Sequence, residues 1–198
     1  FGDIVYVGNK SYTDQQLNTL LKIEKGDVYN GAVLKERISG DGSPNSEDIQ
    51  TLYQNSGFLF SSVNAVETKV VNDSITVEVR IREDEKATIN KVSIVGNDKT
   101  NDFVIFRELR VKPGSLFSRD AIIRSIREIG QLGFFDTNVT PDVKPNYQDK
   151  TADIEFSVIE KGGSQIELQG GYGGGSFIGT LGLSFNNFSV RNLFKKEA

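Results

Sequence analysis

Two segments of the chain alternate strictly between apolar and polar residues. In residues 75–82 the odd positions are apolar and the even positions polar, and residues 152–158 repeat the alternation with the even positions apolar. A period of two is typical of a β-strand that has one face against a core and the other in water. We therefore predict that both segments are strands of small sheets with helices on one face.

Helix signals precede each of these strands. Thr13 and Gln16 fit a capping box at a helix start, and Ser118 is suited to cap a later helix. Gly57 and Gly133 are each followed by phenylalanine, and glycine favours the left-handed backbone that ends a helix. Apolar residues at helical spacing predict the buried faces of the helices: Leu17, Leu20 and Leu21; Ile49, Leu52 and Tyr53; Val104, Ile105, Phe106 and Leu109; and Ile122, Ile126 and Ile129.

The same succession of signals occurs twice. The segment 3–10, with the sequence DIVYVGNK, returns at 91–98 as KVSIVGND. We predict the order β-α-α-β-β in two tandem units, residues 1–86 and 87–161, each a small mixed sheet covered by two helices, which is an α+β fold. The first copy is longer, and residues 39–46 are its obvious insertion, predicted as a flexible turn between helical pieces.

Residues 162–198 have a different composition. Residues 170–175 are almost all glycine, but the GxGxxG phosphate motif is incomplete because Ser176 stands at its last position. The segments on either side alternate, with one face mainly apolar and the other small or polar, and transmembrane β-strands need about 9–11 such residues. We predict the first strands of a truncated barrel; a soluble hairpin and a disordered tail remain alternatives.

Composition removes several kinds of chemistry. The chain has no Cys and no His, which excludes disulfides, the usual zinc and copper sites and histidine-based catalysis. The net charge of −4, with both signs dispersed, argues against a nucleic-acid-binding module. We expect no enzyme activity, cofactor or metal. Because the chain begins with Phe1 and contains no Met, we also expect it to be part of a longer protein.

The repeats resemble POTRA domains, and the whole chain resembles the BamA family of outer-membrane protein assembly factors, particularly sequences from Bacteroidetes-like bacteria. The second copy has the sharper match and is similar to the last POTRA domain before the barrel. The residues that carry the resemblance are Val95-Gly96-Asn97, Lys99-Thr100, Arg107-Glu108-Leu109, Gly114, Leu132-Gly133-Phe134-Phe135-Asp136, Val158, Glu160, Gly170-Gly171-Tyr172-Gly173, Phe185-Asn186-Asn187-Phe188 and Asn192-Leu193-Phe194.

The resemblance implies a periplasmic arm on the inner side of the outer membrane, in a protein whose barrel is integral to that membrane. Such arms receive unfolded outer-membrane β-barrel proteins and bind accessory lipoproteins, and the complete factor inserts its clients without ATP. The first barrel strand is then expected near residues 164–170. The family alternatives are the POTRA arm of another translocation or autotransporter-assembly barrel, and a non-catalytic POTRA scaffold such as a division-septum protein.

Client binding by strand addition needs an exposed sheet edge. In the resembled family the second strand of each unit is the edge, here near residues 62–70 and 137–145. Pro141 and Pro145 remove backbone donors from the later edge. We therefore predict that the first edge, with Val63, Ala65 and Val66, is the better docking strand, although many such edges simply face water.

A second candidate site is the pair Arg107 and Glu108, predicted on a helix beside a buried leucine. The resemblance implies contact with a partner lipoprotein or with the barrel, while an ordinary solvated ion pair explains the same residues equally well. The acidic run at 83–85 marks the expected junction between the units. Because the connection is short, we expect a limited range of hinge angles.

Overall fold

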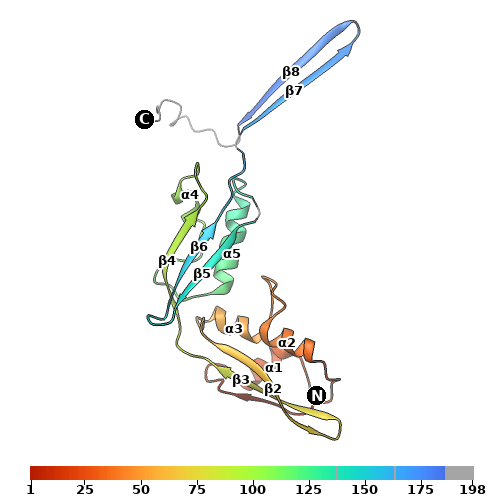
Figure 1. Cartoon of the computed structure of the whole chain (residues 1–198), viewed down its shortest axis with the longest axis vertical. Helices are drawn as coiled ribbons and strands as arrows, with labels where there is room; N and C mark the ends of the chain where they lie inside the picture. Colours follow the sequence, from red (N-terminus) through yellow and green to blue (C-terminus); the bar gives the residue numbers. More distant parts are fainter. Residues whose placement is uncertain (137, 163, 186–198) are drawn as a thin grey trace.

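The computed structural model describes residues 1–136, 138–162 and 164–185, and it shows two similar α+β units followed by a hairpin (Figure 1). The expected strand start at residue 137 and the family-like residues 186–194 lie outside the described residues. Among the described residues, no helix is long and apolar enough to cross a membrane.

The first unit has one three-stranded sheet and three helices. Its strand order is β1-β3-β2, with β1 parallel and β2 antiparallel to the central β3. The elements are β1 (Ile4–Val7), α1 (Asp14–Leu21), α2 (Gly31–Ser39), α3 (Ile49–Asn55), β2 (Ser62–Val71) and β3 (Ser74–Arg82).

The second unit repeats this topology, with strand order β4-β6-β5. The predicted α+β class with two repeats is confirmed. The elements are β4 (Thr88–Val95), α4 (Asp102–Phe106), α5 (Arg119–Gln131), β5 (Thr140–Asn146) and β6 (Thr151–Ser157).

The number of helices in the first unit differs from the prediction. The insertion divides what is one helix in the second unit, α5, into α2 and α3, so the first unit has three helices instead of two. Both pieces have their own start, because Asn30 caps α2 and Asp48 caps α3 through side-chain acceptors. Gly40 ends α2 with a φ of 78°, a conformation that favours glycine.

Local capping is otherwise as the sequence predicts. Thr13 forms a full capping box with Gln16, and the Ser118 hydroxyl accepts the backbone N–H of Ala121. Gly57 and Gly133 have positive φ at the ends of α3 and α5. These signals were readable because each involves residues only a few positions apart.

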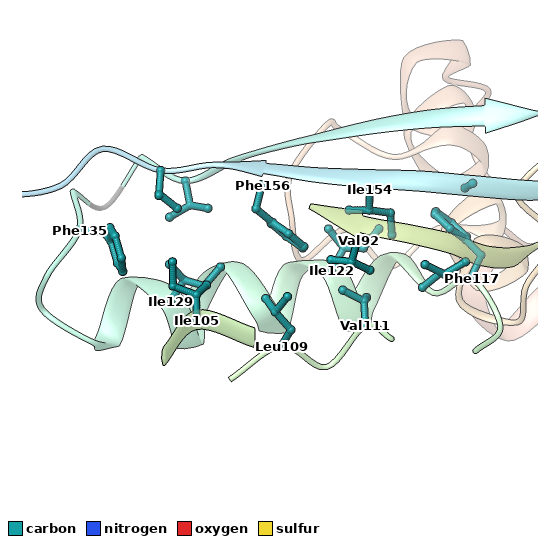
Figure 2. Close-up of a cluster of buried hydrophobic side chains, with 14 of the residues drawn as sticks. Val92, Ile105, Leu109, Val111, Phe117, Ile122, Ile129, Phe135, Ile154 and Phe156 are labelled. Atoms are coloured by element: carbon teal, nitrogen blue, oxygen red, sulfur yellow. The ribbon is translucent and has the colours of Figure 1, made fainter. Parts of the chain in front are cut away.

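Each unit encloses its own apolar core. Figure 2 shows the second core, in which Ile154 and Phe156 of β6 point toward Ile122 and Ile129 of α5. The prediction for α4 is partly wrong: Ile105 is buried, but Phe106 remains 40% exposed because α4 is a single short helix beside the sheet. Apolar burial of this kind is the main source of stability for so small a unit.

The repeated glycine–asparagine turn has the same geometry in both units. A Cβ at Gly96 would lie 2.1 Å from the Val158 carbonyl oxygen, and a Cβ at Gly8 would lie equally close to the Ile81 carbonyl oxygen. Asn97 Nδ2 donates to the Thr100 carbonyl and to Asp102 Oδ1. The turn thus holds the first strand against the last and sets the start of the following helix.

Residues 164–185 form a hairpin of β7 (Ser164–Gly173) and β8 (Ser176–Phe185), turned through Gly174 and Gly175, both with positive φ. The register places apolar residues opposite one another on one face, with Leu168 facing Leu181 and Tyr172 facing Phe177. The opposite face carries pairs such as Gln169 with Thr180. Leu168 and Phe177 are 80% and 87% exposed.

Candidate docking edge and junction between the units

Strand β2 is an edge of the first sheet, as predicted. The three residues proposed for docking do not share one environment. The Val63 side chain is buried in the core, Val66 is half-buried and Ala65 is exposed. Val63 therefore has a structural role in addition to any docking role, whereas Ala65 leaves the strand open to a neighbour.

The first position of this edge is already occupied. The Gln50 side chain, from the first turn of α3, accepts the Val63 backbone N–H at 3.1 Å and donates to the Ser61 carbonyl oxygen at 3.0 Å. The Val63 N–H therefore points away from β3, toward the edge. Because backbone groups alternate in direction along a strand, the N–H groups of Ala65 and Glu67 share that outward direction.

The regular outward spacing of these N–H groups is interrupted after Glu67. The pairing of β2 with β3 shifts register between Glu67 and Lys69, which is the mark of a β-bulge at Thr68. The Tyr29 hydroxyl donates to the Glu67 carboxylate, so this side chain is held beside α2. The uninterrupted part of the outward edge, before the bulge, is consequently short.

Strand β5 is the corresponding edge of the second sheet, and it is poorer in donors. Pro141 and Pro145 lie four positions apart, so their missing N–H groups would have pointed to the same side. Proline in an edge strand normally turns its nitrogen away from the ladder. Between these prolines, Val143 provides the one outward N–H.

A groove of about 590 Å³ lies between β5 and α5 and extends to the first unit. Ile122, Ile126 and Val143 form part of its apolar wall on the second unit. Gly42 and Pro44, from the insertion of the first unit, form part of the other wall. The groove therefore depends on how the two units are placed.

Arg119, at the start of α5, joins the second unit to the first. Its guanidinium donates to the Thr51 hydroxyl at 2.6 Å and to the Ser43 carbonyl oxygen at 3.1 Å. The Thr51 hydroxyl in turn donates to the buried carboxylate of Asp48 at 2.7 Å. Asp120 N–H adds a bond to Asn55 Oδ1. The first turn of α5 is thus bonded to the insertion and to α3 of the first unit.

Lys150 makes a second junction, from the turn between β5 and β6. Its ammonium group donates to Asp84 Oδ1 at 2.9 Å and lies 5.2 Å from the centroid of the Phe60 ring. The Phe60 ring also packs against Tyr147, with centroids 4.6 Å apart. The hydrogen bond from Lys150 is the main reason that the pKa of Asp84 lies below its ordinary value.

The predicted pair Arg107 and Glu108 lies just beyond α4, not on a helix as expected, because α4 ends at Phe106. Arg107 Nε donates to Glu108 Oε1 at 3.0 Å, and both residues are accessible. They lie in the second unit, well apart in the sequence from Val63, Ala65 and Val66 of the first.

Sequence patterns gave no sign of Gln50, Arg119 or Lys150 because their partners are distant in the chain.

Comparison with known proteins identifies the repeated unit. The family model described as POTRA, surface antigen variable number repeat, matches residues 1–84 and again residues 87–161. The chain belongs to the POTRA family. These two POTRA domains correspond to the two α+β units, and the recognition from sequence is confirmed at this level. An origin in Bacteroidetes-like bacteria stays a prediction.

Among named relatives, the outer membrane protein assembly factor BamA of Nitratidesulfovibrio vulgaris is 28% identical over 98% of this chain and 24% of its own length. The BamA of Neisseria meningitidis is 30% identical over 63% of this chain and 16% of its own length. A putative outer membrane protein assembly factor of Treponema pallidum is 23% identical over 99% of this chain and 23% of its own length. The chain spans about a quarter of the length of the first of these relatives.

Two solved structures have the same fold. POTRA domains 3–5 of BamA from Haemophilus influenzae align with a TM-score of 0.65 at 18% identity, over 81% of this chain and 61% of theirs. BamA from Haemophilus ducreyi lacking POTRA domains 1–3 aligns with a TM-score of 0.64 at 20% identity, over 92% of this chain and 33% of its own.

Proposed function

We propose that the chain is the barrel-proximal part of the periplasmic arm of a BamA-type outer-membrane protein assembly factor. The arm assists the folding and insertion of β-barrel proteins by binding unfolded clients and accessory lipoproteins. The observation that carries this proposal is the succession of two POTRA domains and a hairpin with one apolar face. A role in binding, without catalysis, also suits a chain that has neither His nor Cys.

The hairpin supports the placement beside the outer membrane. Leu168, Tyr172, Phe177 and Leu181 share the face that the register defines, and all four side chains are exposed. An apolar face of this length is costly in water but stable against lipid acyl chains. We assign residues 162–198 to the start of a transmembrane barrel and residues 1–86 and 87–161 to the POTRA domains on its periplasmic side.

We assign client binding to the β2 edge near Ala65. An extended segment adds to an edge through main-chain hydrogen bonds, and these bonds make little demand on sequence, which suits many clients. Ala65 has a small exposed side chain and an outward N–H, whereas β5 is blunted by Pro141 and Pro145. The first POTRA domain is therefore the better place for strand addition.

The Ala65→Pro variant tests this assignment. We would titrate the 198-residue chain with a synthetic peptide that has the alternating pattern of a transmembrane strand, and follow backbone amide shifts by NMR. The proline removes the outward N–H, so binding should weaken severalfold. Ala65→Val keeps this N–H and should bind as the parent does.

A thermal melt of both variants separates lost docking from lost folding. If a folded Ala65→Pro variant binds the peptide as tightly as the parent, the β2 edge is not the docking site. The absence of shifts along β2 at millimolar peptide would indicate an arm that positions partner proteins instead of capturing clients.

A further inference from the structure

The carboxamide of Gln50 contacts the β2 edge as one residue of a neighbouring parallel strand would. It donates through Nε2 to the carbonyl oxygen of Ser61 and accepts through Oε1 from the N–H of Val63. These two backbone groups lie on either side of Ser62. An incoming parallel strand bonds an edge in the same manner, with one residue spanning the groups before and after its partner. A side-chain amide has the same donor and acceptor as a peptide group.

The surroundings fix this side chain in place. Gln50 lies in the first turn of α3, which Asp48 caps by accepting the Thr51 N–H at 2.8 Å. Gln50 Nε2 is also 3.0 Å from the hydroxyl oxygen of Ser61, and that hydroxyl donates to the Phe58 carbonyl. The contact therefore joins the start of α3 to the start of β2 through several mutually supporting hydrogen bonds.

We propose that Gln50 is an internal strand surrogate that closes the first pairing position of β2 and determines where a bound client strand begins. This inference rests on the proposed function, because it concerns the same docking edge. With Val63 occupied by Gln50 and the register shifted after Glu67, the outward N–H groups in regular spacing between these two points are those of Ala65 and Glu67.

The proposed function supplies the occupant, and the short run of free N–H groups limits how much of it pairs with β2. It is an extended segment of an unfolded β-barrel protein, paired with β2 over about three residues. So few main-chain bonds give weak and quickly reversible binding, which suits an arm that passes its clients onward. The two POTRA domains thus limit their edges by different means, the first with the Gln50 side chain and the second with prolines.

The Gln50→Ala variant tests the surrogate. In NMR titration of the 198-residue chain with the transmembrane-strand peptide, the parent should show shifts that begin at Ala65 and exclude the Val63 amide. In Gln50→Ala the Val63 N–H is free, so the shifts should extend to Val63 and the peptide should bind about two- to tenfold more tightly. Gln54→Ala, one turn further along α3, is the matched control and should behave as the parent does.

Amide hydrogen exchange without peptide provides an independent measurement. The Val63 amide should exchange faster in Gln50→Ala than in the parent, while the amides of β3 keep their rates. If Gln50→Ala shows the same shifted residues, the same peptide affinity and the same Val63 exchange rate as the parent, Gln50 does not limit pairing with β2. The proposed docking edge would stand in that case. If the parent shows no shifts along β2, the proposed docking function fails and the surrogate fails with it.

Discussion

The carboxylate of Glu160 accepts the backbone N–H of Thr100 at 2.6 Å, although 60 positions separate the two residues. Its other oxygen accepts the N–H of Lys99 at 3.0 Å. In the first domain Glu83 occupies the equivalent place and accepts both the N–H and the hydroxyl of Ser11. One carboxylate per domain therefore holds the turn after the first strand against the end of the last.

These carboxylates should make stability depend on pH. Burial disfavours their charged form, but the hydrogen bonds from Thr100, Lys99 and Ser11 outweigh it, so the pKa values of Glu160 and Glu83 lie below their ordinary value. The stabilisation is complete above the ordinary glutamate pKa and is lost as pH falls through the lowered values. In denaturant unfolding, the free energy of unfolding should fall more steeply with falling pH in the parent than in the double variant E83Q/E160Q. Parallel pH curves for the two proteins would contradict this role of the carboxylates.

Gly96 should tolerate no side chain. A Cβ there would lie 2.1 Å from the Val158 carbonyl oxygen, and the backbone has a φ of 90°. We expect Gly96→Ala to lower the free energy of unfolding by more than about 2 kcal/mol, since both close contact and backbone strain act against it. Gly130 on α5 has no heavy atom near its added Cβ, so Gly130→Ala should raise stability by roughly 0.5–1 kcal/mol.

Arg119 should limit bending between the domains, because it bonds Thr51 and Ser43 from the start of α5. With one spin label on an exposed site of each domain, double electron–electron resonance measures the distance between the labels. The distribution of this distance should be narrow in the parent and broader in Arg119→Gln. Arg124 pairs with Asp120 on the same helix, so Arg124→Gln is the control and should leave the distribution narrow. Equal widths in all three proteins would show that other contacts fix the angle.

Charge reversal at Glu108 tests the proposed lipoprotein contact. Glu108 pairs with Arg107 at the surface, and such an exposed pair contributes little to folding. Glu108→Lys should therefore leave the melting temperature nearly unchanged and weaken the binding of an accessory lipoprotein, measured by calorimetry on the complete assembly factor. Unaltered partner affinity would identify the pair as an ordinary solvated contact.

The sequence predicted those parts of the fold that depend on near neighbours. Capping by Thr13 and Ser118 and the alternation of β3 and β6 involve residues within a few positions of one another, and the duplication made each copy a check on the other. The length of α4 was less predictable. An apolar run such as Phe103 to Phe106 fits a buried helix, but Ile105 alone in this run is fully buried, and Phe103 remains 70% exposed.

The candidate site was less accessible to sequence reasoning. The edge position of β2 came from the family resemblance, while the state of that edge depends on Gln50, 13 positions from Val63. Arg119 and Thr51 are 68 positions apart and meet only when both domains are folded. Polar side chains of this kind have no periodic signature, because their partners are chosen by tertiary packing.

The parallel pairing of first and last strands has a mechanical consequence. In each domain the chain enters along β1 or β4 and leaves along β3 or β6, in the same direction and side by side. Tension applied along the chain pulls the two neighbouring strands in opposite senses, so the hydrogen bonds between them are loaded together in shear and cannot open one after another. A pulling force from a client or from the membrane would thus be transmitted through each domain before either one unravels.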